Sequence, residues 1–297
     1  MPKYHISHMT RYEYDAPLTG ECFMEARLRP LTVPGEQVCR SYAIAVDPPA
    51  PVFGYDQLHQ MGLVNHFVVR GEPYQTLSIC AESDVETLKS NPFETLNLLV
   101  EDWPALADKS LHEEHAEYLA PTPLVPLFGS WSGPEPLPSV LAYGQALSHE
   151  ICSEVDYVPG STDLLTPLTD FVAQKRGVCQ DYAHLMLAAA RSRGVPARYV
   201  SGYIYAGAGD GTQGAGATHA WVELFLPQSD DWKSTGVWTG FDPTNDILTA
   251  GSHIKIAVGR DYSDVPPTKG LVRAAVGCPL PSETALIVEV SVKRVEE

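Results

Sequence analysis

The segment around Cys179 constrains the fold of this chain more than any other part of the sequence. Cys179 opens a predicted helix that runs to about residue 193, and Gly177 stands two positions before it. The unpaired N–H groups and partial positive charge of a helix N-terminus stabilise a thiolate, and glycine permits a sharp turn into the helix. The pattern predicts a nucleophilic cysteine, although a buried structural cysteine also fits this position taken alone.

Two later segments supply the partners that a nucleophilic thiol requires. His219 opens an alternating apolar strand, and Asp242 ends a later strand directly before a proline. A neutral imidazole accepts the thiol proton and later protonates a leaving amine, and a neighbouring carboxylate selects its tautomer. The separations of 40 residues (219 − 179) and 23 residues (242 − 219) fit neighbouring strands packed on one helix. Asn245 is an alternative orienting residue.

Attack on a carbonyl also requires donors for the developing oxyanion. The backbone N–H of Cys179 is one candidate, Tyr157 is a second, more speculative candidate, and Gln174 is a weaker one. Asp181 and His184 lie in the same predicted helix as the cysteine. We expect Asp181 to interact with the helix dipole or a basic residue, and His184 to be a core or surface residue.

Composition limits the classes of partner. The chain has 297 residues, of which 44% are hydrophobic and 19% charged, which is typical of a globular protein with a substantial core. A net charge of −17 disfavours binding to nucleic acid and to anionic membrane surfaces. No run approaches the ~20 apolar residues of a membrane span, and the first residues lack the apolar segment of a signal peptide. The oligomeric state is not indicated.

The cysteines indicate the cellular compartment in which we expect the protein. Six cysteines are scattered along the chain without a CxxC motif or paired Cys/His spacing, so neither a structural zinc site nor another cofactor is predicted. An even number could form disulfides in a secreted protein. Without a signal peptide we expect reduced thiols and a cytoplasmic protein. The cysteines are Cys22, Cys39, Cys80, Cys152, Cys179 and Cys278.

The chain divides into three parts. Residues 1–88 alternate in hydrophobicity between turns, which predicts a β-rich, sandwich-like N-terminal domain. Residues 89–138 carry many prolines, so we expect an ordered connector with short helices. Residues 139–297 place helices before antiparallel strands, which predicts an α+β fold and a catalytic domain with a helix packed on an antiparallel sheet. The glycine-rich segment 206–217 is expected to be a flexible loop, and one hypothesis is that it gates the site. The expected helices are 111–119, 139–151, 164–176 and 179–193, and the later strands are 198–205, 219–226, 238–242 and 285–292.

Together these motifs resemble the transglutaminase-like superfamily in its bacterial two-domain form, whose members include proteins labelled cysteine proteases. The resemblance covers nearly the whole chain, and it is weaker in the N-terminal third. It implies a papain-like Cys-His-Asp site on Cys179, His219 and Asp242. The motifs that carry it are DYVPGST (156–162), GVCQDYAH (177–184), ARYVSGY (197–203), HAWVE (219–223), FDPTN (241–245) and VGRDYSDVPP (258–267).

The resemblance implies attack of the thiol on an amide, either a peptide bond or a glutamine side chain, with a thioester intermediate. Water then gives hydrolysis, which we slightly favour, and an amine gives transamidation. Animal members use calcium, but this sequence has no EF-hand loop, and Asp230-Asp231 is a weak carboxylate pair. Two other hypotheses remain open, namely an amidase acting on small or glycan-linked amides and a non-catalytic binding module that keeps the fold.

Overall fold

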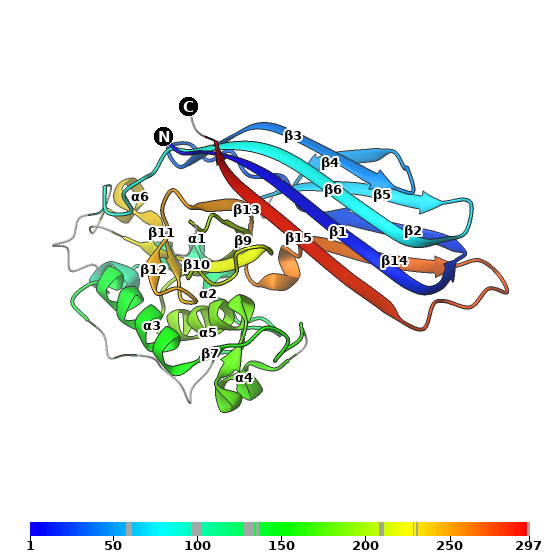
Figure 1. Cartoon of the computed structure of the whole chain (residues 1–297). Coiled ribbons are helices and arrows are strands. Elements are labelled where there is room, and N and C mark those ends of the chain that lie inside the picture. Colours follow the sequence, from blue (N-terminus) through cyan, green and yellow to red (C-terminus); the bar gives the residue numbers. More distant parts are fainter. Residues whose placement is uncertain are drawn as a thin grey trace.

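The structure is a computed structural model of the 297-residue chain. It describes residues 1–57, 61–94, 96, 103–127, 134, 137–164, 166–207, 211–227, 229 and 231–295. A β-sandwich extends to one end of the molecule, and helices packed on a five-stranded sheet form the other end (Figure 1). Within the described ranges, no helix combines the length and apolarity that crossing a membrane requires.

The β-sandwich consists, among the described residues, of two four-stranded antiparallel sheets with the orders β15-β1-β6-β3 and β14-β2-β5-β4. The period-2 pattern predicted for the first strand is confirmed, because Tyr4, Ile6, His8 and Thr10 are all buried on one face. The strands are β1 (Lys3–Leu18), β2 (Gly20–Ala26), β3 (Gln37–Asp47), β4 (Val52–Asp56), β5 (Leu63–Arg70), β6 (Tyr74–Thr87), β14 (Thr268–Ala274) and β15 (Thr284–Val295).

The last two strands correct the predicted domain boundary. β15 pairs with β1 over its whole length, from Lys3↔Val295 to Tyr14↔Thr284, and β14 pairs with β2. The end of the predicted domain 139–297 therefore belongs to the sandwich that the first residues begin. Alternating hydrophobicity predicts that a segment is a strand but does not identify the strand with which it pairs, so the sequence did not indicate this pairing.

The second half confirms the predicted α+β class. The order of its five-stranded sheet is β12-β11-β10-β9-β13, and α3 and α5 pack together against this sheet (Figure 1). Every side chain of α5 from Asp181 to Arg191 is buried, and alanines in this run let the helix approach the strands closely. The helices are α3 (Val140–Glu154), α4 (Leu168–Gln174) and α5 (Cys179–Ser192), and the strands are β9 (Ala197–Ile204), β10 (His219–Leu226), β11 (Val237–Asp242), β12 (Ile247–Leu248) and β13 (His253–Gly259).

Short elements connect these units. The predicted helix 111–119 is divided into α1 and α2 at His115. The predicted helix 164–176 is shortened to α4, which begins after the extended backbone of Pro167 and ends at Lys175 in the left-handed conformation. Of the glycine-rich segment 206–217, residues 208–210 lie outside the described residues, and residues 213–216 form turns. The remaining elements are η1 (Trp103–Ala107), α1 (Lys109–Glu114), α2 (Ala116–Leu119), β7 (Asp156–Tyr157), β8 (Arg176–Gly177), α6 (Trp232–Thr235) and η2 (Tyr262–Asp264).

Candidate active site

Helix α5 carries Cys179 at its first position. The preceding backbone N–H, that of Val178, donates to Oδ2 of Asp181 at 2.9 Å, and the Thr162 hydroxyl donates to the same oxygen at 2.6 Å. A Cβ on Gly177 would come within 2.6 Å of this oxygen, so the turn accepts only glycine without rearrangement. Asp181 therefore caps the N-terminus of α5, where the sequence predicted an interaction with the helix dipole. These hydrogen bonds hold the start of the helix in place.

His219 and Asp242 come from adjacent antiparallel strands. β10 and β11 pair in the register Val222↔Phe241, which brings the beginning of β10 to the end of β11. Nε2 of His219 donates a hydrogen bond to Oδ2 of Asp242 at 2.8 Å, and both side chains are completely buried. The carboxylate therefore fixes the orientation of the ring and the nitrogen that carries the proton.

The pKa values of the pair move in opposite directions. Burial disfavours the charged imidazole, but the charge and hydrogen bond of Asp242, with help from Cys179, outweigh burial and raise the pKa of His219 to about 10. Burial also disfavours the charged carboxylate, but His219 and a hydrogen bond from His253 hold the pKa of Asp242 well below its usual value. The favoured state of the pair is carboxylate and imidazolium.

The thiol of Cys179 contributes to the raised pKa of His219 through its charge and a polar interaction, after the larger effects of burial and of Asp242. Since Nε2 is bonded to Asp242, Nδ1 is the ring nitrogen that remains for the thiol. Nδ1 is buried and has no hydrogen-bond partner among the described residues. The structure thus joins the imidazole and the carboxylate that the sequence selected through a direct hydrogen bond, and the position of the sulfur beside Nδ1 stays a prediction.

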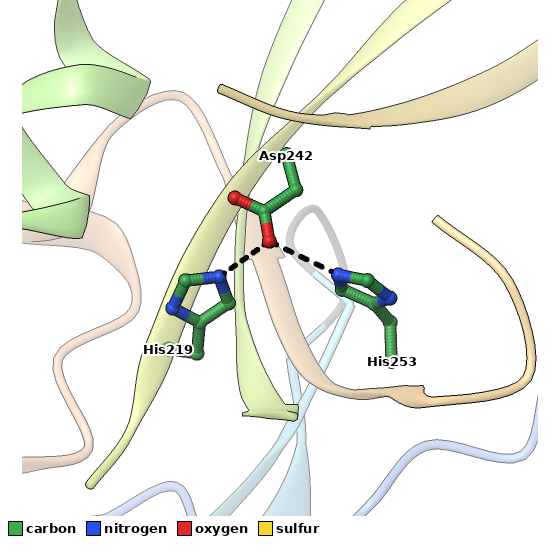
Figure 2. Close-up of side chains that lie close together, drawn as sticks. All are labelled: His219, Asp242 and His253. Carbon is green, nitrogen blue, oxygen red and sulfur yellow. Dashed lines mark hydrogen bonds and ion pairs between the residues drawn. The ribbon is translucent and has the colours of Figure 1, made fainter. Parts of the chain in front are cut away.

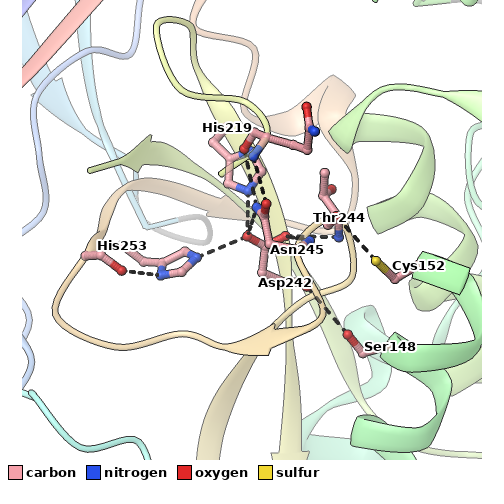
Figure 3. Close-up of polar contacts among 9 residues, drawn as sticks. Ser148, Cys152, His219, Asp242, Thr244, Asn245 and His253 are labelled. Atoms are coloured by element: carbon pink, nitrogen blue, oxygen red, sulfur yellow. Dashed lines mark hydrogen bonds and ion pairs between the residues drawn. The ribbon is translucent and has the colours of Figure 1, made fainter. Parts of the chain in front are cut away.

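The carboxylate of Asp242 accepts more hydrogen bonds than the sequence indicated (Figure 3). Oδ2 accepts from His219, from Nδ2 of Asn245 at 2.8 Å and from Nε2 of His253 at 3.2 Å. Oδ1 accepts from the backbone N–H groups of Thr244 and Asn245 at 3.0 and 3.3 Å. Asn245, predicted as an alternative orienting residue for the histidine, instead holds the carboxylate.

His253 is the site residue that sequence reasoning missed. It opens β13, and its side chain is buried beside Asp242 on the side away from His219 (Figure 2). The available signal was a histidine at the start of an apolar strand, the same signal that selected His219. Without a motif around it, however, a histidine at a strand start is more often an ordinary core or surface residue.

The same three side chains offer ligand atoms within 4.8 Å of one another, as a metal site would require: His219, Asp242 and His253. In the structure, however, these atoms bond to each other, and both rings direct a nitrogen at a single carboxylate oxygen that Asn245 also contacts. A metal would have to displace both ring protons from these bonds. The donor set therefore fits a hydrogen-bonded cluster better than a metal centre.

Part of the predicted flexible loop lies against this cluster. A Cβ on Gly214 would come 2.4 Å from Nδ1 of His219. The loop is anchored on one side where the Gln213 backbone N–H donates to Oδ1 of Asn245 at 2.8 Å. On the other side, the Val290 N–H of β15 donates to the carbonyl of Gly216 at 3.0 Å. The loop therefore connects the surroundings of the carboxylate to the sandwich.

Tyr157 is half-buried, with its ring centroid 6.3 Å from that of Tyr182 in α5, whereas Gln174 is exposed at the end of α4. Burial, followed by the negative charges of Cys179 and Asp242, raises the pKa of Tyr157 to about 12, so its phenol stays protonated and can donate. His184, which was predicted to be a core or surface residue, is buried, and its Nε2 accepts from the Tyr262 N–H at 3.3 Å.

A helix that begins with cysteine, packed on a sheet that supplies histidine and aspartate, defines an α+β fold of the transglutaminase and papain-like kind. Residues 135–243 match the transglutaminase-like superfamily, and residues 4–86 match the bacterial transglutaminase-like N-terminal region. The chain belongs to the transglutaminase-like superfamily, in the form that carries this N-terminal region.

Relatives with similar sequences extend over nearly the whole chain. An uncharacterized protein of Mycobacterium leprae is 32% identical over 277 residues, which are 90% of this chain and 91% of that protein. One of Mycobacterium tuberculosis (strain ATCC 25618 / H37Rv) is 31% identical over 285 residues, or 91% and 87% of the two chains. The crystal structure titled "Putative Cysteine Protease from Cytophaga hutchinsonii" matches with a TM-score of 0.74 and 19% identity over 100% of this chain and 91% of that one. At this identity, the match shows the fold alone.

Proposed function

We propose that this protein is a thiol enzyme that attacks amide bonds through Cys179, His219 and Asp242. The observation that carries the proposal is the buried 2.8 Å bond between His219 and Asp242, which leaves Nδ1 without a partner among the described residues. A cysteine at the start of α5, whose charge helps to raise the pKa of His219, supports it. A nucleophile, a base and an orienting acceptor in this order constitute the machinery of covalent acyl transfer. Membership of the superfamily supports the same class of chemistry.

The first half of the reaction forms a thioester. In the carboxylate–imidazolium state the proton of the Cys179 thiol already resides on Nδ1 of His219, and the sulfur forms a bond to the amide carbonyl carbon as the carbonyl oxygen becomes an oxyanion. The oxyanion accepts from the Cys179 N–H and, in our proposal, from the hydroxyl of Tyr157. When the carbon–nitrogen bond breaks, the proton on Nδ1 passes to the leaving nitrogen, and Asp242 stabilises the imidazolium until then.

The second half of the reaction releases the acyl group. His219 takes a proton from water or from an amine, which attacks the thioester carbon, and the sulfur leaves as the thiolate. We propose hydrolysis of a peptide or protein amide as the main outcome, and transamidation or hydrolysis of a small amide as alternatives with the same first half. The alternative of a non-catalytic binding module would require that no acyl-enzyme forms.

The test is to trap the acyl-enzyme. Wild-type protein and the Cys179→Ala variant are incubated with cell extract, and adducts are identified by mass spectrometry. A mass increase on Cys179 of the wild type alone is expected, and the adduct identifies the substrate. The matched control is Cys152→Ala, which removes another half-buried thiol and should leave the adduct intact. An identical adduct pattern in wild type and Cys179→Ala would refute the proposal.

Alkylation provides a test that needs no substrate. Iodoacetamide should modify Cys179 fastest among the six free cysteines, because this thiol opens a helix and interacts electrostatically with an imidazole held by a carboxylate. Equal and slow labelling of all accessible thiols would contradict the proposal.

We also propose a cytoplasmic location for the protein, for which the six free cysteines are the support. Cell fractionation tests this location.

A further inference from the structure

Two histidines share one carboxylate oxygen at the candidate active site (Figure 2). Nε2 of His219 lies 2.8 Å and Nε2 of His253 lies 3.2 Å from the same oxygen, Oδ2 of Asp242. The side chains are 0%, 2% and 0% exposed in the order His219, His253 and Asp242, so water does not compete for these bonds. The reaction proposed above uses one of the two rings, that of His219, and gives no task to the other.

The protonation of His253 follows from its partners. A carboxylate only accepts, so Nε2 of His253 carries a proton, and Nδ1 accepts from the Ser252 hydroxyl at 3.3 Å. A single carboxylate balances one positive charge. Burial lowers the pKa of His253, Asp242 opposes this, and the charge of His219 lowers it further. When His219 is the imidazolium, His253 is therefore a neutral hydrogen-bond donor.

Among the described residues, the other surroundings of His253 supply no hydrogen-bond partner for Nε2 besides Asp242. The edge of the Trp221 ring packs against the imidazole with centroids 5.3 Å apart. A cavity of ≈ 30 Å³, large enough for about one water molecule, also borders the ring. The charged groups that line this cavity are Glu36, Lys89, Glu223 and Lys255, and Lys255 forms ion pairs with both glutamates.

We propose that His253 is a positioning residue that acts through Asp242: as a neutral donor it holds Oδ2 in place and disperses its negative charge, so that His219 releases its proton more readily to the leaving nitrogen. This inference rests on the proposed function. A carboxylate with fewer donors holds an imidazolium more tightly, and a more tightly held proton makes His219 a weaker acid. The effect is separate from the burial and packing of the ring.

The test is the pH dependence of Cys179 alkylation by iodoacetamide, which requires no substrate. His253→Phe keeps the ring packing but removes the donor, and His253→Gln keeps a donor. In the wild type, the alkaline transition reports deprotonation of the imidazolium of His219. We expect His253→Phe to move this transition up by about one pH unit and His253→Gln to leave it within a few tenths of a unit. His8→Phe is the control, since it removes a buried imidazole that contacts Tyr203 and Thr10 instead of Asp242.

The outcomes separate the inference from the proposed function. A wild-type profile without any imidazole transition would refute the function. A normal wild-type profile with an unshifted His253→Phe profile would refute only the role of His253. If His253→Phe does not fold, ¹⁵N NMR of the wild-type rings decides, because the inference requires His253 to stay neutral throughout the range in which His219 is charged. A charged His253 beside a neutral His219 would overturn it.

Discussion

Gly214 lies so close to His219 that a Cβ at this position would come 2.4 Å from Nδ1 of the imidazole. The backbone of Gly214 has a φ of +82°, a conformation that other residues rarely adopt. The glycine-rich loop therefore covers the ring nitrogen that must exchange a proton with the thiol. Its glycine allows this close approach without displacing the histidine.

Substitution of this glycine should impair the site. In Gly214→Ala the new methyl group must displace the imidazole or the loop, so we expect Cys179 alkylation and acylation to slow by about 10–100-fold. The matched control is Gly216→Ala, whose φ of +88° is similarly strained but whose Cβ would meet nothing within 4 Å. Rates are measured with iodoacetamide and with the trapped substrate. Equal effects of the two variants would show that backbone strain, rather than the contact with His219, matters.

The carboxylate of Asp242 should be essential for acylation. Asp242→Asn removes the negative charge that supports the imidazolium and offers an amide group in place of an acceptor oxygen. We expect acyl-enzyme formation to fall by about 10³–10⁴-fold, while the protein stays folded. The comparison is Asp246→Asn at the exposed neighbouring carboxylate, which pairs with His149 and should change the rate less than twofold. A loss below tenfold in Asp242→Asn would argue against an orienting role.

The hydroxyl of Tyr157 should stabilise the oxyanion without changing the reactivity of the Cys179 thiol. Tyr157→Phe removes one proposed donor, so we expect acylation to slow by about 100-fold. Alkylation of Cys179 by iodoacetamide forms no oxyanion, and its rate should stay within twofold of the wild type. Tyr182→Phe is the control, since its hydroxyl donates to the carbonyl of Val155 and should affect stability alone. Parallel losses of both rates in Tyr157→Phe would indicate a structural role.

The stability of the protein should fall in alkaline solution because of His219. Its pKa in the folded protein, about 10, lies above the ordinary value of 6.5. The raised pKa contributes stability that is fully present below pH 6.5 and is lost as the pH rises through 10. We expect the Tm of the wild type to fall by about 3 °C or more relative to His219→Gln between pH 7 and pH 10. Parallel Tm curves for the two proteins would show that the imidazolium contributes nothing.

Local sequence was sufficient for the elements that hold the three main residues. Cys179 follows a glycine turn and opens an apolar helix, and His219 and Asp242 each lie at the end of a strand-like segment before or after a turn signal. Such signals depend on residues that are close in the chain, within about two helical turns or one strand of each other. The α+β class and the β-rich first third could be predicted for the same reason.

The sequence did not reveal features that depend on long-range pairing. β15 lies next to β1, and their paired residues are 270 (284 − 14) to 292 (295 − 3) positions apart in the chain. The alternation of β15 is compatible with many partners. His253 reaches Asp242 only because β13 and β11 are parts of one sheet, in which the connecting loops bring the imidazole of His253 to Oδ2 of Asp242. The contact of Gly214 with His219 likewise depends on how the loop is anchored.

The sequence by itself determined which residue types could carry acyl transfer and on which helix and strands they lie, because those assignments follow from short-range periodicity and capping. Only the tertiary structure decided which side chains share the carboxylate of Asp242, what covers His219, and which strands complete the sandwich. These relationships arise from the packing of distant segments, where the favourable contacts depend on three-dimensional position rather than on distance along the chain.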